Sequence, residues 1–133
     1  MYKEQYVLGD IMKEYLAGYF DAKASISLRP VGQRYQLFIT MAHRAFDVLN
    51  MFKTGYGGNI TPSQGTHLYQ ITAKKAEGML TDLLPHLVLK KELAECALDY
   101  RTLVGFRSED VAKEKVDLLN LFNALKEVLY EKS

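Results

Sequence analysis

Cysteine, proline and tryptophan are scarce in this 133-residue chain, which holds one, three and none of them respectively. A single cysteine excludes an internal disulfide, and Cys96 lies in the apolar run LAECAL at residues 93–98, which predicts a buried thiol rather than a nucleophile. Long apolar runs are also lacking, and the first ten residues do not resemble a signal peptide. We therefore expect a protein of the cytoplasm, in a bacterium or a phage-infected cell, or of an organelle, with no membrane partner.

An excess of charge of one sign is lacking too. Seventeen basic and sixteen acidic residues leave a net charge of +1, whereas many DNA-binding domains are strongly basic because they neutralise phosphates. The bulk charge therefore does not favour a nucleic-acid partner, and only an uneven distribution of the charge would do so. The three histidines, His43, His67 and His86, show no spacing typical of a metal site, so neither a metal nor a cofactor is predicted.

Hydrophobic residues make up 48% of the chain and no low-complexity linker interrupts them, which predicts one domain over residues 1–133. Helix formers predict a helix over residues 11–20. Polar and apolar residues then alternate over residues 24–29 and 34–41, on either side of a turn at Pro30-Val31-Gly32, which indicates a β-hairpin. The alternation places Arg34, Gln36, Phe38 and Thr40 on one face, and Tyr35, Leu37, Ile39 and Met41 on the other.

A second unit of the same kind follows. We expect a helix near residues 45–52, a hairpin formed by residues 57–61 and 67–72, and a third helix that ends at Pro85. Two more helices are predicted, one over residues 90–104 and one that begins at Ser108, whose hydroxyl suits an N-cap. The fold class is therefore α+β, with an αββαββα core at about residues 10–105 and a last helix at about residues 108–131.

The stretch LAGYFDAKASI at residues 16–26 resembles the nine-residue signature of the LAGLIDADG homing endonucleases and the strand that follows it. Six of the nine signature positions are acceptable, and the predicted element order is that of the family. The later run LPHLVLKKELA at residues 84–94 is also similar to the family's segment after the third helix. The resemblance covers residues 10–105 and implies a single-motif protein of this family.

A single motif implies a homodimer, because the signature helix of this family packs against a second copy of itself. Small residues allow two helices to approach closely, and Gly18 and Ala22 lie on one helical face. The resemblance places the following residues at the dimer interface: Leu16, Ala17, Gly18, Asp21 and Ala22.

The eighth position of the signature is an acid in the family, where two such acids hold divalent metal over the scissile phosphates. Here this position is Lys23, whose ammonium group cannot bind a metal ion. A polar residue that orders water at the end of the second strand corresponds to Met41, whereas a basic residue after the third helix is retained at Lys90. These changes predict a protein without catalytic residues that is not an enzyme. Two Lys23 side chains at the dimer axis are a candidate counter-charge for phosphates.

In the family, the two hairpins form a sheet that lies along the major groove of DNA. Side chains on one face of such a sheet contact base edges, and basic residues in loops contact phosphates. The resemblance gives as candidate DNA-binding residues Ser25, Ser27, Arg29, Arg34, Gln36, Phe38 and Thr40 on the first hairpin, Asn59, Thr61, His67, Tyr69 and Gln70 on the second, and Lys53, Lys74 and Lys75 outside them.

The function predicted from these residues is that of a catalytically inactive, homodimeric protein that reads duplex DNA, in transcription regulation or in a phage or mobile element. Three alternatives stay open. The first is a metal-dependent DNA endonuclease with a displaced acid. The second is a maturase-like RNA-binding protein, since Phe38 and Tyr69 are aromatic side chains of the kind that stack on unpaired bases. The third is a module with a protein partner.

Overall fold

The structure is a computed structural model that describes residues 10–32, 34–106 and 108–131. Its helices are α1 (Asp10–Lys23), α2 (Phe46–Tyr56), α3 (Ala73–Leu83), α4 (Lys91–Thr102) and α5 (Glu109–Glu131), with a short 3-10 helix η2 (Leu84–His86) between α3 and α4. The strands are β1 (Ser25–Val31), β2 (Arg34–His43), β3 (Asn59–Ser63) and β4 (Thr66–Thr72). The predicted α+β class and the αββαββα order with two further helices are confirmed.

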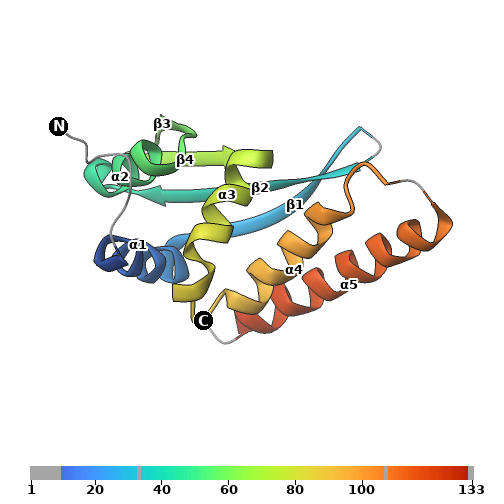
Figure 1. Cartoon of the computed structure of the whole chain (residues 1–133). Coiled ribbons are helices and arrows are strands. Elements are labelled where there is room, and N and C mark those ends of the chain that lie inside the picture. The colour runs from blue at the N-terminus through green and yellow to red at the C-terminus, as the bar shows by residue number, and fades with distance from the viewer. Residues whose placement is uncertain (1–9, 33, 107, 132–133) are drawn as a thin grey trace.

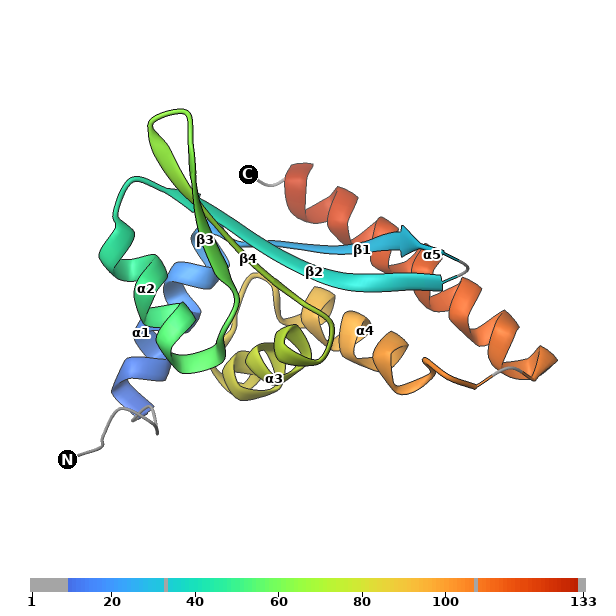
Figure 2. The ribbon, with the colours of Figure 1, turned by 90° about the horizontal axis from the view of Figure 1, so that it is seen from above.

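The four strands form one antiparallel sheet in the order β1-β2-β4-β3, so the two hairpins meet at the β2–β4 pair. Helices α1, α3, α4 and α5 lie on one side of this sheet (Figure 1), and the sheet twists along its length (Figure 2). The opposite side carries no helix in the part of the chain that the structure describes. One face of the sheet is therefore covered and the other is open.

The core lies between the covered face and the helices. Alternate residues of the strands enter it, because successive side chains of a strand point to opposite faces. The buried strand residues are Ile26, Leu37, Ile39, Met41, Tyr69 and Ile71, and helices α1 and α3 contribute Leu16, Phe20, Met79 and Leu80. Cys96 is buried as predicted, and its Sγ lies 3.3 Å from the carbonyl oxygen of Leu118, which links α4 to α5.

Asp82 of α3 joins three helices. Its carboxylate accepts a hydrogen bond from the hydroxyl of Tyr56 at 2.6 Å and pairs with the ammonium group of Lys13 at 3.0 Å. Burial raises the pKa of Asp82, but the hydrogen bond from Tyr56 and the charge of Lys13 outweigh burial and hold this pKa below its usual value. The network fixes α1 and α2 against α3.

The start of α5 agrees with the sequence prediction. The hydroxyl of Ser108 accepts a hydrogen bond from the backbone amide of Val111 at 3.2 Å, which is the geometry of an N-cap. None of the helices that the structure describes is long and apolar enough to span a membrane.

Candidate nucleic-acid interface

The open face of the sheet brings polar side chains from all four strands into rows. Cross-strand pairing aligns Ser25 with Thr40, Thr40 with Gln70, and Gln70 with Asn59. Ser25, Thr40 and Gln70 alternate with buried residues of their own strands, and Asn59 pairs with Gln70, so the four side chains lie on the uncovered face. One row of hydroxyl and amide groups therefore crosses the whole sheet.

Three further rows run parallel to the first. Their members are Ser27, Phe38 and Thr72; Arg29 and Gln36; and Ala42, Leu68 and Thr61. Arg34 is exposed at the start of β2. The predicted residues of the first hairpin thus share one face, as do Asn59, Thr61 and Gln70 of the second.

Charge is distributed very unevenly around this face. None of the residues in the four strands is aspartate or glutamate. Residues 22–76, which include the whole sheet, contain seven lysines or arginines and one acidic residue, Asp47, so this segment has a net charge of +6 while the rest of the chain has −5. The near-neutral total therefore conceals a basic segment that contains the open face.

Arg29 is held in place on the open face. Its guanidinium carbon lies 4.7 Å from the centroid of the Phe38 ring, which is a cation–π contact. The ring of Phe38 is therefore covered on one side by Arg29, and the charged group stands above the sheet. A guanidinium fixed in this way can donate two parallel hydrogen bonds to a guanine edge or to a phosphate.

Two of the predicted contact residues lie on the covered face instead. Tyr69 is fully buried and its hydroxyl donates a hydrogen bond to the carbonyl oxygen of Gly57 at 2.6 Å, so the prediction that it contacts nucleic acid is wrong. His67 lies two residues before Tyr69 on β4, so its side chain points to the same face of the sheet. Its ring packs edge-on against the ring of Phe46, with the two centroids 5.4 Å apart. The physical reason is register, because a strand offset by one residue exchanges its two faces.

Met41 is likewise a core residue, only 1% exposed. It was predicted to occupy the polar, water-ordering position at the end of β2, but its side chain faces the helices. The neighbouring open-face positions on β2 are Thr40 and Ala42. The loss of a polar residue at position 41 therefore does not indicate whether water is ordered on the open face.

Helix α1 presents an apolar face that the other described residues of the chain leave uncovered. Met12, Tyr15, Gly18 and Ala22 are exposed at helical spacing, and Tyr15 keeps 52% of its surface. Leu16 and Ala17 are fully buried within their own chain, so the prediction that they lie at the dimer interface is wrong. Asp21 is 8% exposed, and its place at the interface stays a prediction. Gly18 and Ala22 remain candidates for it.

The end of α1 is tied to the loop after η2 by Asp21. The two carboxylate oxygens accept hydrogen bonds from the backbone amides of Val88 at 2.7 Å and Lys90 at 3.0 Å. The ammonium group of Lys90 in turn donates to the backbone carbonyl of Asp21, and Lys90 is 8% exposed. Asp21 is thus a structural acceptor, and the retained basic residue Lys90 is fixed beside the last turn of α1.

Lys23 is exposed in the last turn of α1, where a cation suits the negative end of the helix dipole. This end of the helix offers no carboxylate to a divalent metal, because Lys23 is a cation and Asp21 is turned into its own chain. Within one subunit, no group of three histidines, cysteines or acids among residues 10–32, 34–106 and 108–131 could hold a metal ion. The described residues at this end of α1 therefore do not fit a divalent metal ion.

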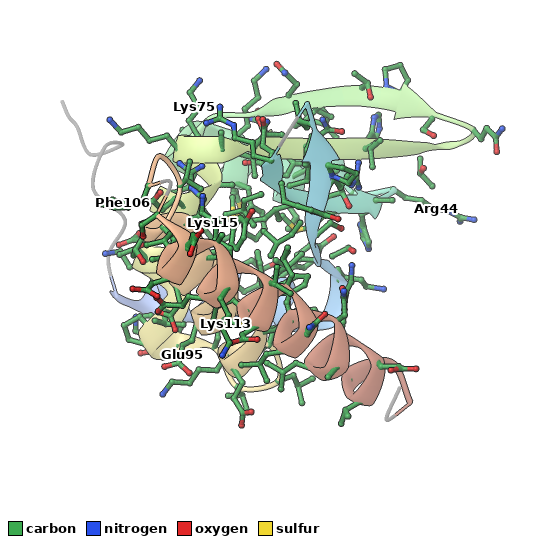
Figure 3. All side chains as sticks on the ribbon, turned by 90° about the vertical axis from the view of Figure 1, so that its right-hand side faces the viewer. Arg44, Lys75, Glu95, Phe106, Lys113 and Lys115 are labelled. Carbon is green, nitrogen blue, oxygen red and sulfur yellow. The ribbon has the colours of Figure 1, made fainter. Side chains whose placement is uncertain are left out.

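The predicted phosphate contacts lie outside the sheet. Lys53 is exposed on α2, and Lys74 and Lys75 are exposed in the first turn of α3. The side chain of Lys75 lies against Gly57, two residues before β3 begins. Figure 3 shows Lys75 and Arg44 at the periphery of the molecule, on opposite sides of the view.

Sequence reasoning missed two residues at this face. Thr72 pairs with Phe38 on the open face and was detectable from the period of two that places Gln70 there. Lys126 of α5 reaches Ser27, with its ammonium nitrogen 3.3 Å from the hydroxyl oxygen. No local pattern signals this contact, because the two residues are 99 positions apart.

Solved structures of homing endonucleases share this architecture. One is the homing endonuclease I-CvuI in complex with its target in the presence of 2 mM Ca. The alignment covers 86% of this chain and 82% of the I-CvuI chain, with a TM-score of 0.74 and 20% sequence identity. Another is the archaeal intron-encoded homing endonuclease I-Vdi141I complexed with DNA. Here the alignment covers 93% of this chain and 85% of the I-Vdi141I chain, with a TM-score of 0.64 and 19% sequence identity. The LAGLIDADG meganuclease I-AabMI, bound to uncleaved DNA, matches 80% of this chain but only 43% of its own, with a TM-score of 0.62 and 21% identity.

No protein-family model and no curated protein matches the sequence. The structural likeness shows that the chain has the fold of the LAGLIDADG homing endonucleases. It also overturns the prediction that the chain is not an enzyme, because the proteins that share the fold are named as endonucleases. The exchange of one acid for Lys23 is insufficient ground for an inactive protein.

Proposed function

We propose that this protein binds duplex DNA through the open face of its sheet. The observation that carries the proposal is the absence of acidic residues from all four strands, in a segment whose net charge is +6. Phosphate binding rests on such local concentrations of cations, and base reading requires the hydroxyl, amide and guanidinium groups that the open face carries. The structures with this fold that were solved with DNA give independent support.

The open face fits a duplex better than single-stranded RNA. Stacking on unpaired bases requires exposed aromatic rings, but Tyr69 is buried and Arg29 covers one side of Phe38. Most of the remaining side chains of the face are polar groups and arginines, which suit base edges and phosphates in a groove, while Ala42 and Leu68 are apolar. We therefore favour duplex DNA over the maturase-like alternative.

The proposed assembly is a homodimer joined through α1. Its uncovered face combines small residues at Gly18 and Ala22 with apolar side chains, and the adjoining loop exposes 78% of Val88 and 64% of Leu89. The loop belongs to the same surface because Asp21 of α1 binds the amide of Val88. An apolar surface of this kind is typical of an interface. The chain spans most of I-CvuI but less than half of I-AabMI, as expected for a protein that needs two copies.

A second candidate function is metal-dependent DNA cleavage, as in the endonucleases that share the fold. The ligands would have to come from groups other than Lys23, and the I-CvuI structure with 2 mM Mg is named as revealing DNA not cleaved. Incubation of supercoiled plasmid with magnesium or manganese tests this candidate. Nicked or linear product that EDTA abolishes would support it, and intact plasmid at saturating protein would count against it. A role in transcription regulation remains a prediction from the sequence.

The binding proposal is tested by adding one negative charge to the open face. Thr40→Glu places a carboxylate in the middle of the row that crosses the sheet, where it would repel phosphates and leave base acceptors unpaired. We expect at least a ten-fold loss of affinity for duplex DNA in a fluorescence anisotropy titration. Thr81→Glu, on the exposed side of α3, is the matched control and should bind like the wild type. Equal affinities for all three proteins would contradict the proposal.

A further inference from the structure

Helix α5 brings a lysine to the border of the open face. Lys126 donates to the hydroxyl of Ser27 on β1, the edge strand of the sheet. Ser27 belongs to the open face because its neighbour Ile26 is buried in the core. Figure 2 shows α5 crossing beneath the β1–β2 hairpin, with its C-terminal part beyond β1. Helix α5 itself lies on the covered side of the sheet, so only its part around Lys126 reaches the β1 edge, and we call this part the rim of α5.

The position of Lys126 is fixed by packing. Its ammonium group lies 5.8 Å from the centroid of the Phe122 ring, and Phe122 is itself buried. The stem of a half-buried lysine can cover apolar surface while its charged group stays in water. A charge held in one place loses little conformational entropy when it binds a ligand, so it is prepared for a contact at this edge.

The width of the sheet indicates what lies at this edge when DNA is bound. Four strands span three gaps of about 4.8 Å, or about 14 Å in total, close to the major groove width of about 12 Å. A sheet of this width in the groove has one phosphate backbone beside each edge strand. The rim formed by α5 adjoins the β1 edge, so Lys126 would face a phosphate rather than a base.

We propose that the rim of α5, through Lys126, is a surface that contacts the DNA backbone and adds to the groove-reading face. This inference rests on the proposed binding of duplex DNA. It assigns the C-terminal helix, which is separated from the sheet in sequence, a part in DNA binding. The kind of partner is a phosphodiester backbone, which is recognised by charge without reference to base sequence.

Salt dependence of duplex binding tests the inference, with Lys126→Met as the main variant. Methionine removes the charge and keeps an apolar stem over Phe122. The slope of log Kd against log salt changes by about 0.9 for each phosphate contact, so a dimer that loses two should show a slope smaller by about 1.8. Lys113→Met removes a charge from an exposed position on the same helix (Figure 3) and should leave the slope unchanged. Lys126→Arg should retain the wild-type slope.

The possible outcomes are distinct. If Lys126→Met and the wild type bind with equal slopes, the rim makes no backbone contact and the inference is overturned while the proposed function stands. Equal reductions in Lys126→Met and Lys113→Met would indicate a general effect of charge and would also overturn it. If the wild type binds no duplex DNA, both proposals fail. Urea unfolding of each variant shows whether the fold is intact, and Lys126→Arg provides the comparison if the methionine variant is unstable.

Discussion

Replacing Asp21 by asparagine probes how the end of α1 is built. The carboxylate accepts two backbone hydrogen bonds, at 2.7 and 3.0 Å, from the loop that carries Lys90. Asparagine keeps one acceptor oxygen and places an NH₂ group against the second amide. The variant therefore loses one hydrogen bond to a charged group, about 1.5–3 kcal/mol, and leaves a buried N–H without an acceptor, about 1–3 kcal/mol. We expect a loss of about 3 kcal/mol in the free energy of unfolding.

Urea unfolding at fixed protein concentration measures this loss, since coupling to a dimer would make stability depend on concentration. The expected change lowers the melting temperature by about 10 °C for a chain of this size. Asp117→Asn, at an exposed position of α5, is the control and should change stability by less than about 0.5 kcal/mol. A loss below about 1 kcal/mol for Asp21→Asn would refute the reasoning that this carboxylate fixes the loop.

Three further predictions concern the dimer, the core and the end of α1. A Cβ atom built at Gly18 or Gly78 meets no heavy atom of the described residues within 4 Å beyond its chain neighbours and its own helix backbone, so Gly18→Leu should abolish the dimer in sedimentation velocity while Gly78→Leu keeps it; a dimeric Gly18→Leu protein would contradict the α1 interface. Burial raises the pKa of Tyr69 from 10.0, so the folded state keeps a proton that the unfolded state releases above about pH 10, and stability should fall as the pH rises from there. Tyr69→Phe loses the hydrogen bond to Gly57, about 1 kcal/mol, and should show a shallower fall above pH 10; an identical pH profile would count against this account. Lys23→Ala should reduce the salt slope of DNA binding if Lys23 contacts phosphate, and an unchanged slope would exclude that contact.

Periodicity in the sequence predicted the elements because burial on one face imposes it. The alternation over residues 34–41 correctly placed Leu37 and Ile39 inside and Gln36 and Thr40 outside. The same alternation put Met41 inside, which conflicts with the water-ordering role that alignment to the family gave it. On the second hairpin the pattern was weaker, and a shift of one residue brought His67 and Tyr69 to the wrong face.

Tertiary contacts were beyond the reach of local pattern. Asp21 was predicted at the dimer interface because the signature helix as a whole was assigned there, but its carboxylate binds a loop 67 residues later in the chain. Lys126 reaches the sheet only because α5 packs on α4, which in turn contacts β1. The net positive charge of residues 22–76 follows from the sequence alone. Its link to a DNA-binding surface depends on the fold, because these residues contain all four strands of the sheet.

Selection of bound sequences from a random pool of duplex DNA tests the central claim most directly. A homodimer that reads the major groove with two copies of the open face should enrich a pseudo-palindromic site, because each half-site meets an identical surface. The Thr40→Glu protein, treated in the same way, should enrich nothing. Recovery of an unselected pool by the wild-type protein, at low salt and with a folded dimer, would contradict the claim that the acid-free face of the sheet reads duplex DNA.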